Sequence, residues 1–141
     1  MQRSLQQLKK EVYLYDNEQD LWLMAGDIPN SAGNLCLHIC GNLQHFIGAV
    51  LGNTGYVRQR EAEFSTKNVA SDELQALINT TIDDVSHTLE TLDDEILIAD
   101  YPLQIFADPM TTEYFLIHLT SHLGYHLGQI NYHRRLLAKS K

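Results

Sequence analysis

The sequence predicts an all-α protein built as one four-helix bundle. Apolar residues recur at helical spacing in four segments, and stretches rich in Gly, Pro and polar residues separate these segments. The chain has 141 residues, of which 44% are hydrophobic, so one compact core can form without disulfide bonds. We therefore expect residues 1–141 to fold as a single domain.

The first two helices are predicted to be antiparallel neighbours. The first should cover residues 2–25, because apolar side chains recur along it and neither Gly nor Pro interrupts it before Gly26. Ser31 or Asn30 can then accept a hydrogen bond from a free backbone N–H group at the start of a second helix, which should reach about Leu51. The connection between the two helices is short, which favours antiparallel packing.

The third helix is predicted over residues 71–92, after a long polar crossover at 52–70. Ser71 offers a cap, and the two acidic residues after it suit the first turn of a helix, whose positive end favours negative charge. The apolar residues of this segment keep helical spacing: Leu74, Ile78, Ile82, Val85, Leu89 and Leu92.

The fourth helix is expected to begin at Thr111 or Thr112 and to run to about Ala138. Before it, residues 93–110 show only short apolar bursts around two prolines, which predicts a loop with a few extended residues. Both long connections can run the length of a bundle, so the residue pattern alone leaves the order of the helix directions open.

Charge and composition exclude several classes of partner. The formal net charge is −8, and no Lys or Arg lies between Asn68 and His133, so we expect no nucleic-acid partner. No apolar run approaches the roughly 20 residues that span a bilayer, and the first residues lack the apolar region of a secretory signal. The protein is therefore expected to be cytoplasmic, with no membrane partner. Cys36 and Cys40 are expected to be buried packing residues.

The histidine pattern predicts a metal site. His122 and His126 lie one turn apart on the fourth helix, so both rings can reach a single cation. Two protein ligands bind a metal weakly, so a third must come from another helix. The second helix offers a thin polar line along an otherwise apolar surface: Asn34, His38, Asn42 and His45. Because buried imidazole and amide groups cost free energy unless they are paired, we expect the two polar lines to meet at a metal ion or a water cluster.

The remaining histidines and acidic residues have simpler interpretations. His87 is expected on a solvated helix face, and His133 near the surface end of the fourth helix. His118 is either a third member of the polar line or a packed core histidine. The acidic run at 93–95 is expected to be a solvated loop rather than a cation site. The alternative to the metal site is that the His-x-x-x-His pair consists of ordinary surface or core histidines.

Two segments of the sequence resemble a known family, and the likeness spans the whole chain. Residues 122–130 are His-Leu-Gly-Tyr-His-Leu-Gly-Gln-Ile, and residues 37–43 are Leu-His-Ile-Cys-Gly-Asn-Leu. Together they resemble the DinB/YfiT-like superfamily of metal-binding four-helix bundles. Its members carry a His-x-x-x-His-x-Gly-Gln motif on the last helix and one histidine on the second helix.

The resemblance implies that His38, His122 and His126 bind a divalent metal ion, commonly zinc or nickel, with water in the open positions. It also implies an up-down-down-up order of the helices and a homodimer. His45 is the alternative ligand on the second helix, because it lies two turns from His38 on the same face. His38 is preferred, since residues 39–41 match the short stretch that follows the family's histidine.

A metal with three protein ligands keeps a free coordination position, which is typical of catalytic sites. We therefore predict a metal-dependent enzyme that acts on a small-molecule substrate, in which the cation activates water or a thiol. The resemblance favours an S-transferase that uses a low-molecular-weight thiol as cosubstrate, or a hydrolase. No catalytic residue is assigned. Gln129 is expected to support the ligands, and three tyrosines could line the mouth of the site: Tyr13, Tyr15 and Tyr125.

The alternative function is non-catalytic. The protein would then be a metal-stabilised helical bundle, or a stress-related module that holds a ligand without turning it over. A structural metal site should be closed by a fourth protein ligand, for which Asp16, Asp20 and Glu113 are the candidates.

Overall fold

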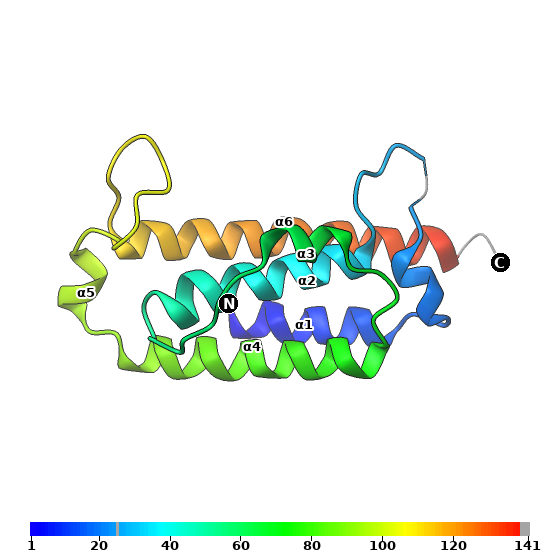
Figure 1. The fold of residues 1–141 in the computed structure, drawn as a ribbon, viewed down its shortest axis with the longest axis horizontal. Coiled ribbons are helices and arrows are strands. Elements are labelled where there is room, and N and C mark those ends of the chain that lie inside the picture. The colour runs from blue at the N-terminus through cyan, green and yellow to red at the C-terminus, as the bar shows by residue number, and fades with distance from the viewer. Residues whose placement is uncertain (25, 139–141) are drawn as a thin grey trace.

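The computed structural model describes residues 1–24 and 26–138 and is built of helices joined by loops (Figure 1). The described residues form six α-helices: α1 (Gln2–Tyr13), α2 (Ala32–Leu43), α3 (Arg60–Ser65), α4 (Ser71–Thr91), α5 (Asp94–Ile98) and α6 (Thr112–Ala138). They also form a 3₁₀ helix, η1 (Glu18–Trp22), and a π-helix, η2 (Gln44–Ala49), that continues α2. Over the same residues no strand is present, and β-type pairing is confined to one isolated bridge between Asp100 and Thr111, so the all-α prediction is confirmed.

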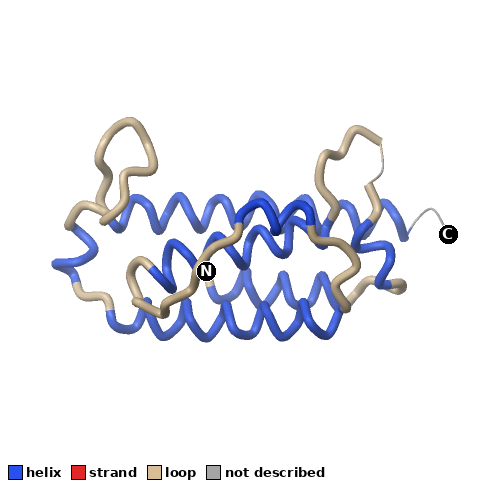
Figure 2. The backbone as a smooth tube through the Cα atoms, viewed as in Figure 1, coloured by secondary structure: helices blue, strands red, loops and turns tan. Residues whose placement is uncertain are grey.

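Of the four long helices α1, α2, α4 and α6, α1 and α2 each pack against both α4 and α6. α1 and α2 run in opposite directions, as predicted, but each packs on α4 and α6 rather than on the other, so the prediction that they are neighbours is wrong. In Figure 1, α1 and α6 run from left to right, whereas α2 and α4 run from right to left. The crossover from η2 to α4 travels along the molecule and carries α3, which packs on α2. Figure 2 shows that the connection from α4 to α6 stays at one end. Only the first of the two long connections therefore runs along the helices.

The first predicted helix is interrupted near its middle. α1 ends at Tyr13, and the Asn17 side chain accepts a hydrogen bond from the backbone N–H of Gln19 at 3.1 Å to begin η1. Asparagine side chains compete in this way with the backbone hydrogen bonds of an α-helix. The single helix predicted over residues 2–25 is therefore wrong, and the break allows Leu21 to turn into the core, where it is fully buried.

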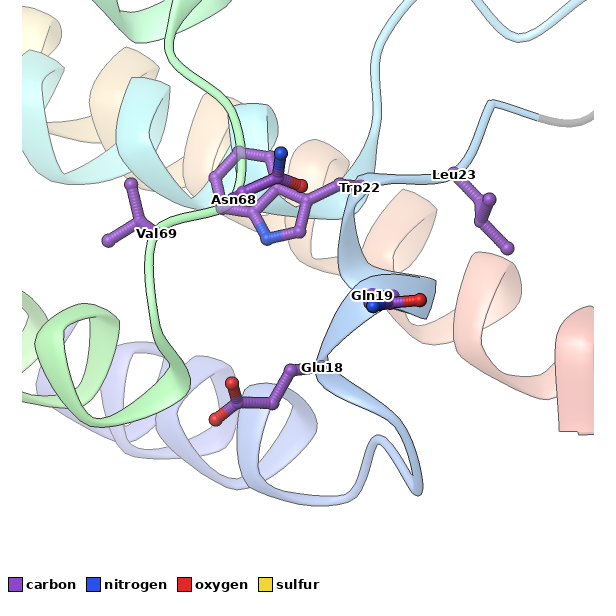
Figure 3. A pocket seen from close by; sticks show the side chains of 6 residues that line it. All are labelled: Glu18, Gln19, Trp22, Leu23, Asn68 and Val69. Carbon is purple, nitrogen blue, oxygen red and sulfur yellow. The ribbon is translucent and has the colours of Figure 1, made fainter.

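The start of α4 is capped from a distant part of the chain. The residue before the helix is Ala70, and the backbone N–H of Ser71 donates to the Glu18 carboxylate at 3.1 Å. Glu18 belongs to η1 and lines a pocket of about 370 Å³ together with Trp22 and Val69 (Figure 3). The prediction that Ser71 caps this helix is wrong, because no side chain caps the helix from within and a free N–H of its first turn is satisfied by Glu18 of η1.

The start of the second helix is as predicted. The Ser31 side chain accepts a hydrogen bond from the backbone N–H of Asn34 at 3.2 Å. A Cβ atom added at Gly33 would lie 2.8 Å from the indole of Trp22, so glycine allows η1 to pack directly on α2. η2 then continues the helical path to Ala49, close to the predicted end.

The core lies between the four long helices, and nearly all residues of α2 are buried. Cys36 and Cys40 are free thiols that are fully buried, as predicted. The largest side chains with almost no exposure come from every long helix: Leu5, Leu8, Leu21, Ile39, Leu43, Ile47, Leu74, Ile78, Phe115, Leu119, Leu123 and Ile130. Burying each of them contributes roughly 1.5–3 kcal/mol to folding.

Both predicted connections contain a short helix. α3 lies within the crossover predicted at 52–70, and α5 lies within the loop predicted at 93–110. The Asp93 side chain caps α5 by accepting a hydrogen bond from the backbone N–H of Ile96 at 2.9 Å, so the acidic run begins a helix and the loop prediction is wrong there. None of the helices described combines the length and the apolar character needed to cross a bilayer.

Candidate metal centre

Three histidines converge where α2 packs against α6. The Nε2 atom of His122 lies 3.2 Å from the Nε2 atom of His38 and 3.1 Å from that of His126. One nitrogen from each ring lies within 4.8 Å of the other two, which is close enough for all three to hold one metal ion. α2 supplies the buried ring, and two successive turns of α6 supply the two half-buried rings.

Hydrogen bonds on the outer side of two rings fix which nitrogens face the centre. Nδ1 of His38 lies 2.9 Å from Oε2 of Glu63, and because a carboxylate only accepts, Nδ1 donates and Nε2 of the neutral ring keeps its lone pair. Nδ1 of His126 donates in the same way to Oε1 of Gln129 at 2.6 Å. The Nε2 lone pairs of His38 and His126 both face Nε2 of His122. That atom carries at most one proton, so it can donate a hydrogen bond to only one of the two rings at a time. A cation satisfies all three nitrogens at once, so this donor set fits a divalent metal ion.

Glu63 is itself held by an arginine. Nε of Arg58 lies 2.7 Å from Oε1 of Glu63, and Nη2 lies 2.9 Å from Oε2. Burial raises the pKa of Glu63, but the hydrogen bonds from His38 and Arg58 outweigh burial, so the net pKa is below the ordinary value. The carboxylate therefore stays charged and orients the His38 ring.

The polar line of α2 also docks the crossover that carries Glu63. Nδ2 of Asn34 donates to the backbone carbonyl oxygen of Glu63 at 2.9 Å and to that of Thr66 at 2.8 Å. A Cβ atom added at Gly41 would collide with the Glu63 carboxylate, so α3 approaches α2 where only a glycine leaves room. Asn34 and Gly41 thus place the carboxylate behind His38.

Burial keeps the α6 rings neutral. It is the main cause that lowers the pKa of His122 to about 4, and repulsion from charge on His126 and His38 adds to the shift. Burial also lowers the pKa of His126, although the hydrogen bond to Gln129 partly offsets it. Neutral imidazole is the form that binds metal ions.

The low pKa of His122 predicts that the metal-free protein loses stability in mild acid. In the unfolded chain the ring takes up a proton near its ordinary pKa of 6.5, whereas in the folded chain it stays neutral until about pH 4. Between these two values the unfolded chain binds a proton that the folded chain does not bind. The contribution of His122 to the free energy of unfolding is therefore fully present above pH 6.5 and is lost progressively as the pH falls towards 4. Urea unfolding of chelator-treated protein at about pH 7 and about pH 5 should show this loss, and His122→Gln should show a smaller one. An equal loss in both proteins would assign the acid sensitivity to other groups.

The other histidines of the sequence are not part of the metal-binding group. His45 packs its ring on Phe46 and lies two turns, about 10.5 Å, along the helix from His38. His118 is exposed, so it is not a packed core histidine. Its ring stacks on Phe115 with ring planes 7° apart and lies 6.4 Å from the ring of His122, so it is a third member of the polar line, although it is not part of the metal-binding group. His87 is exposed, as predicted.

His133 is buried at 5% exposure, so its predicted place near the surface is wrong. Its Nδ1 accepts a hydrogen bond from the Tyr15 hydroxyl at 2.7 Å, and its Nε2 donates to the backbone oxygen of Leu23 at 3.0 Å. His133 therefore connects α6 through two hydrogen bonds to residues that follow α1. Of the other tyrosines, Tyr13 is exposed, whereas the ring of Tyr125 lies 5.2 Å from that of His126.

No fourth protein ligand joins the histidines among residues 1–24 and 26–138. The group of residues placed to share a metal ion there consists of His38, His122 and His126 alone. Asp16, Asp20 and Glu113, the candidates for closing a structural site, are not part of it.

The sequence analysis missed Arg58 and Glu63. Both lie in the polar crossover, where charges of both signs follow one another without a helical period. Mixed charge of this kind usually marks a solvated surface. The spacing of charged residues in this segment does not reveal which acidic side chain turns inward.

Comparison with known proteins places the chain in a family. No curated protein matches the sequence. The sequence model of the family described as Protein of unknown function (DUF1572) matches residues 2–141. Because this match covers almost the whole chain, the protein belongs to the DUF1572 family.

Proposed function

We propose that the protein is a divalent-metal-dependent enzyme of the DinB/YfiT-like superfamily, with zinc or nickel held by His38, His122 and His126. The observation that carries the proposal is the convergence of three Nε2 atoms without a fourth protein ligand among the described residues. Three ligands leave a coordination position for a reactant, whereas structural sites are closed by four. The directions of the long helices in Figure 1 support an up-down-down-up four-helix bundle as the fold.

A divalent cation bound at this site would lower the pKa of a thiol or a water molecule and would polarise a carbonyl group. The protein's own residues prepare the site for it. Glu63 and Gln129 keep protons on the Nδ1 atoms of His38 and His126, so that the Nε2 lone pairs point inward. Arg58 keeps the Glu63 carboxylate charged, and thereby keeps the His38 ring in place.

The proposed reaction transfers a low-molecular-weight thiol to an electrophilic carbon. A sulfur–carbon bond forms, the bond from that carbon to the leaving group breaks, and the leaving group departs with the electron pair. The thiol proton ends on the leaving group or in solvent. With water in place of the thiol, a carbon–oxygen bond forms instead of the sulfur–carbon bond, the same leaving group departs, and the result is hydrolysis. The homodimer, the cytoplasmic location and the identity of the metal stay predictions.

A thiol-consumption assay tests this function. Protein loaded with zinc or nickel is incubated with glutathione, mycothiol or bacillithiol and with an aromatic chloride as the electrophile. We expect thiol consumption that requires the metal and that is lost on chelation and in His122→Ala. The same electrophile without a thiol tests hydrolysis through release of its leaving group. The non-catalytic alternative predicts stoichiometric metal binding without metal-dependent turnover in either assay, and that result would contradict the proposed enzyme and favour a metal-stabilised or ligand-binding bundle.

A further inference from the structure

A largely apolar cavity of about 370 Å³ adjoins the histidine triad. α6 forms one side of it with Tyr125, Tyr132 and Leu136, while Leu35 of α2 and Ile28 of the preceding loop form the other. His126 belongs both to the triad and to the cavity wall. The cavity therefore continues directly from the site where a metal ion would bind.

Two hydrogen-bonding side chains that line the cavity, Gln129 and Tyr125, lie beside His126 of the triad. Oε1 of Gln129 accepts from His126, and Nε2 of Gln129 lies 3.4 Å from the Tyr125 hydroxyl, which leaves one amide hydrogen for a bound molecule. His133 also lines the cavity, but both of its nitrogens are engaged by Tyr15 and Leu23. The lining also includes Asn30 and Tyr132, but as a whole it is mainly apolar. A bound molecule thus meets hydrogen-bonding groups beside His126 within a largely apolar cavity.

We propose that this cavity binds the apolar part of an uncharged electrophilic substrate and directs its polar, reactive end towards the triad. The inference rests on the proposed function, for which it names the class of substrate. No Asp, Glu, Lys or Arg is among the described residues that line the cavity, so an ionised group in the part of the substrate that lies against these walls would lose hydration without gaining a charged side chain as partner. The volume lies within the range of roughly 300–1,000 Å³ that is usual for small-molecule sites.

Two fluorescent probes with the same aromatic skeleton test the inference in metal-free protein. Phenylnaphthylamine is neutral, and anilinonaphthalene sulfonate adds one negative charge to that skeleton. We expect saturable binding of the neutral probe and binding of the sulfonate that is at least about tenfold weaker, because the cavity offers the sulfonate no cation. Fluorescence titration measures both affinities without any reliance on catalysis.

A matched pair of substitutions locates the bound probe. Leu136 is 58% exposed and lines the cavity, whereas Ile117 is 62% exposed on the same helix and does not line it. Both positions tolerate a charge without unfolding the core. Leu136→Glu should weaken binding of the neutral probe at least about tenfold, and Ile117→Glu should leave it unchanged.

The results separate this inference from the proposed function. Equal affinity for the two probes, or equal effects of the two glutamate variants, would overturn the inference even if the protein binds its metal. Conversely, selective binding of the neutral probe by a protein that binds neither zinc nor nickel would support the cavity and reject the metal-dependent enzyme.

Discussion

Replacing His122 by alanine should reduce the bound divalent metal from about one equivalent per chain to none. His122 is the central ring of the triad, because its Nε2 atom lies next to those of both His38 and His126. Without it, the two remaining nitrogens form a two-ligand site that does not survive dialysis. Elemental analysis of protein purified without an affinity tag measures the loss directly.

The matched control is His118→Ala, which removes an exposed histidine one turn earlier on α6. This variant should keep the metal content of the wild-type protein. Circular dichroism confirms that both variants remain helical, so that a loss of metal is not a loss of fold. Full metal content in His122→Ala would show that the ligands have been assigned wrongly.

Glu63→Gln should weaken metal binding by about 10- to 100-fold and should lower the free energy of unfolding by roughly 3 kcal/mol. The affinity falls because the neutral amide holds the Nδ1 proton of His38 less strongly than a carboxylate does. The stability falls because Arg58, whose side chain is only 12% exposed, loses the charge that it pairs with. Calorimetric titration with zinc gives the affinity, and urea unfolding of the metal-free protein gives the stability.

Glu61→Gln is the matched control, because it makes the same chemical change on the same short helix at an exposed position. It should alter neither quantity measurably. A Glu63→Gln variant with reduced stability but unchanged zinc affinity would limit Glu63 to a structural role in the crossover. Equal zinc affinities therefore contradict the proposed support of His38.

The sequence predicted the helices whose apolar spacing is regular and long. α4 and α6 follow their predicted bounds closely, because their apolar residues recur over many turns. The first helix was predicted too long, since apolar spacing continues across Asn17 although the backbone changes there from α1 to η1. The cap on Ser71 was wrong for a different reason: Glu18, which replaces it, lies far away in the sequence.

The sequence also identified the three histidines that come together, because two of them share a helix face and the third lies on a polar line of a buried helix. It did not identify what orients them. Glu63 turns inward only because Asn34 and Gly41 hold α3 against α2, and these are contacts between segments that no periodic pattern relates. Side chains that act through tertiary docking are therefore the part of such a site that spacing leaves hidden.

The position of Glu63 on the crossover has a thermodynamic consequence. The affinity of the three histidines for a cation and the docking of residues 58–66 on α2 are thermodynamically coupled, because Glu63 belongs to that segment. A change that weakens the docking therefore weakens cation binding, and a bound cation stabilises the docked segment by the same free energy. Sequence variation in a stretch that resembles an ordinary connector can thus tune the affinity while all three coordinating residues stay the same.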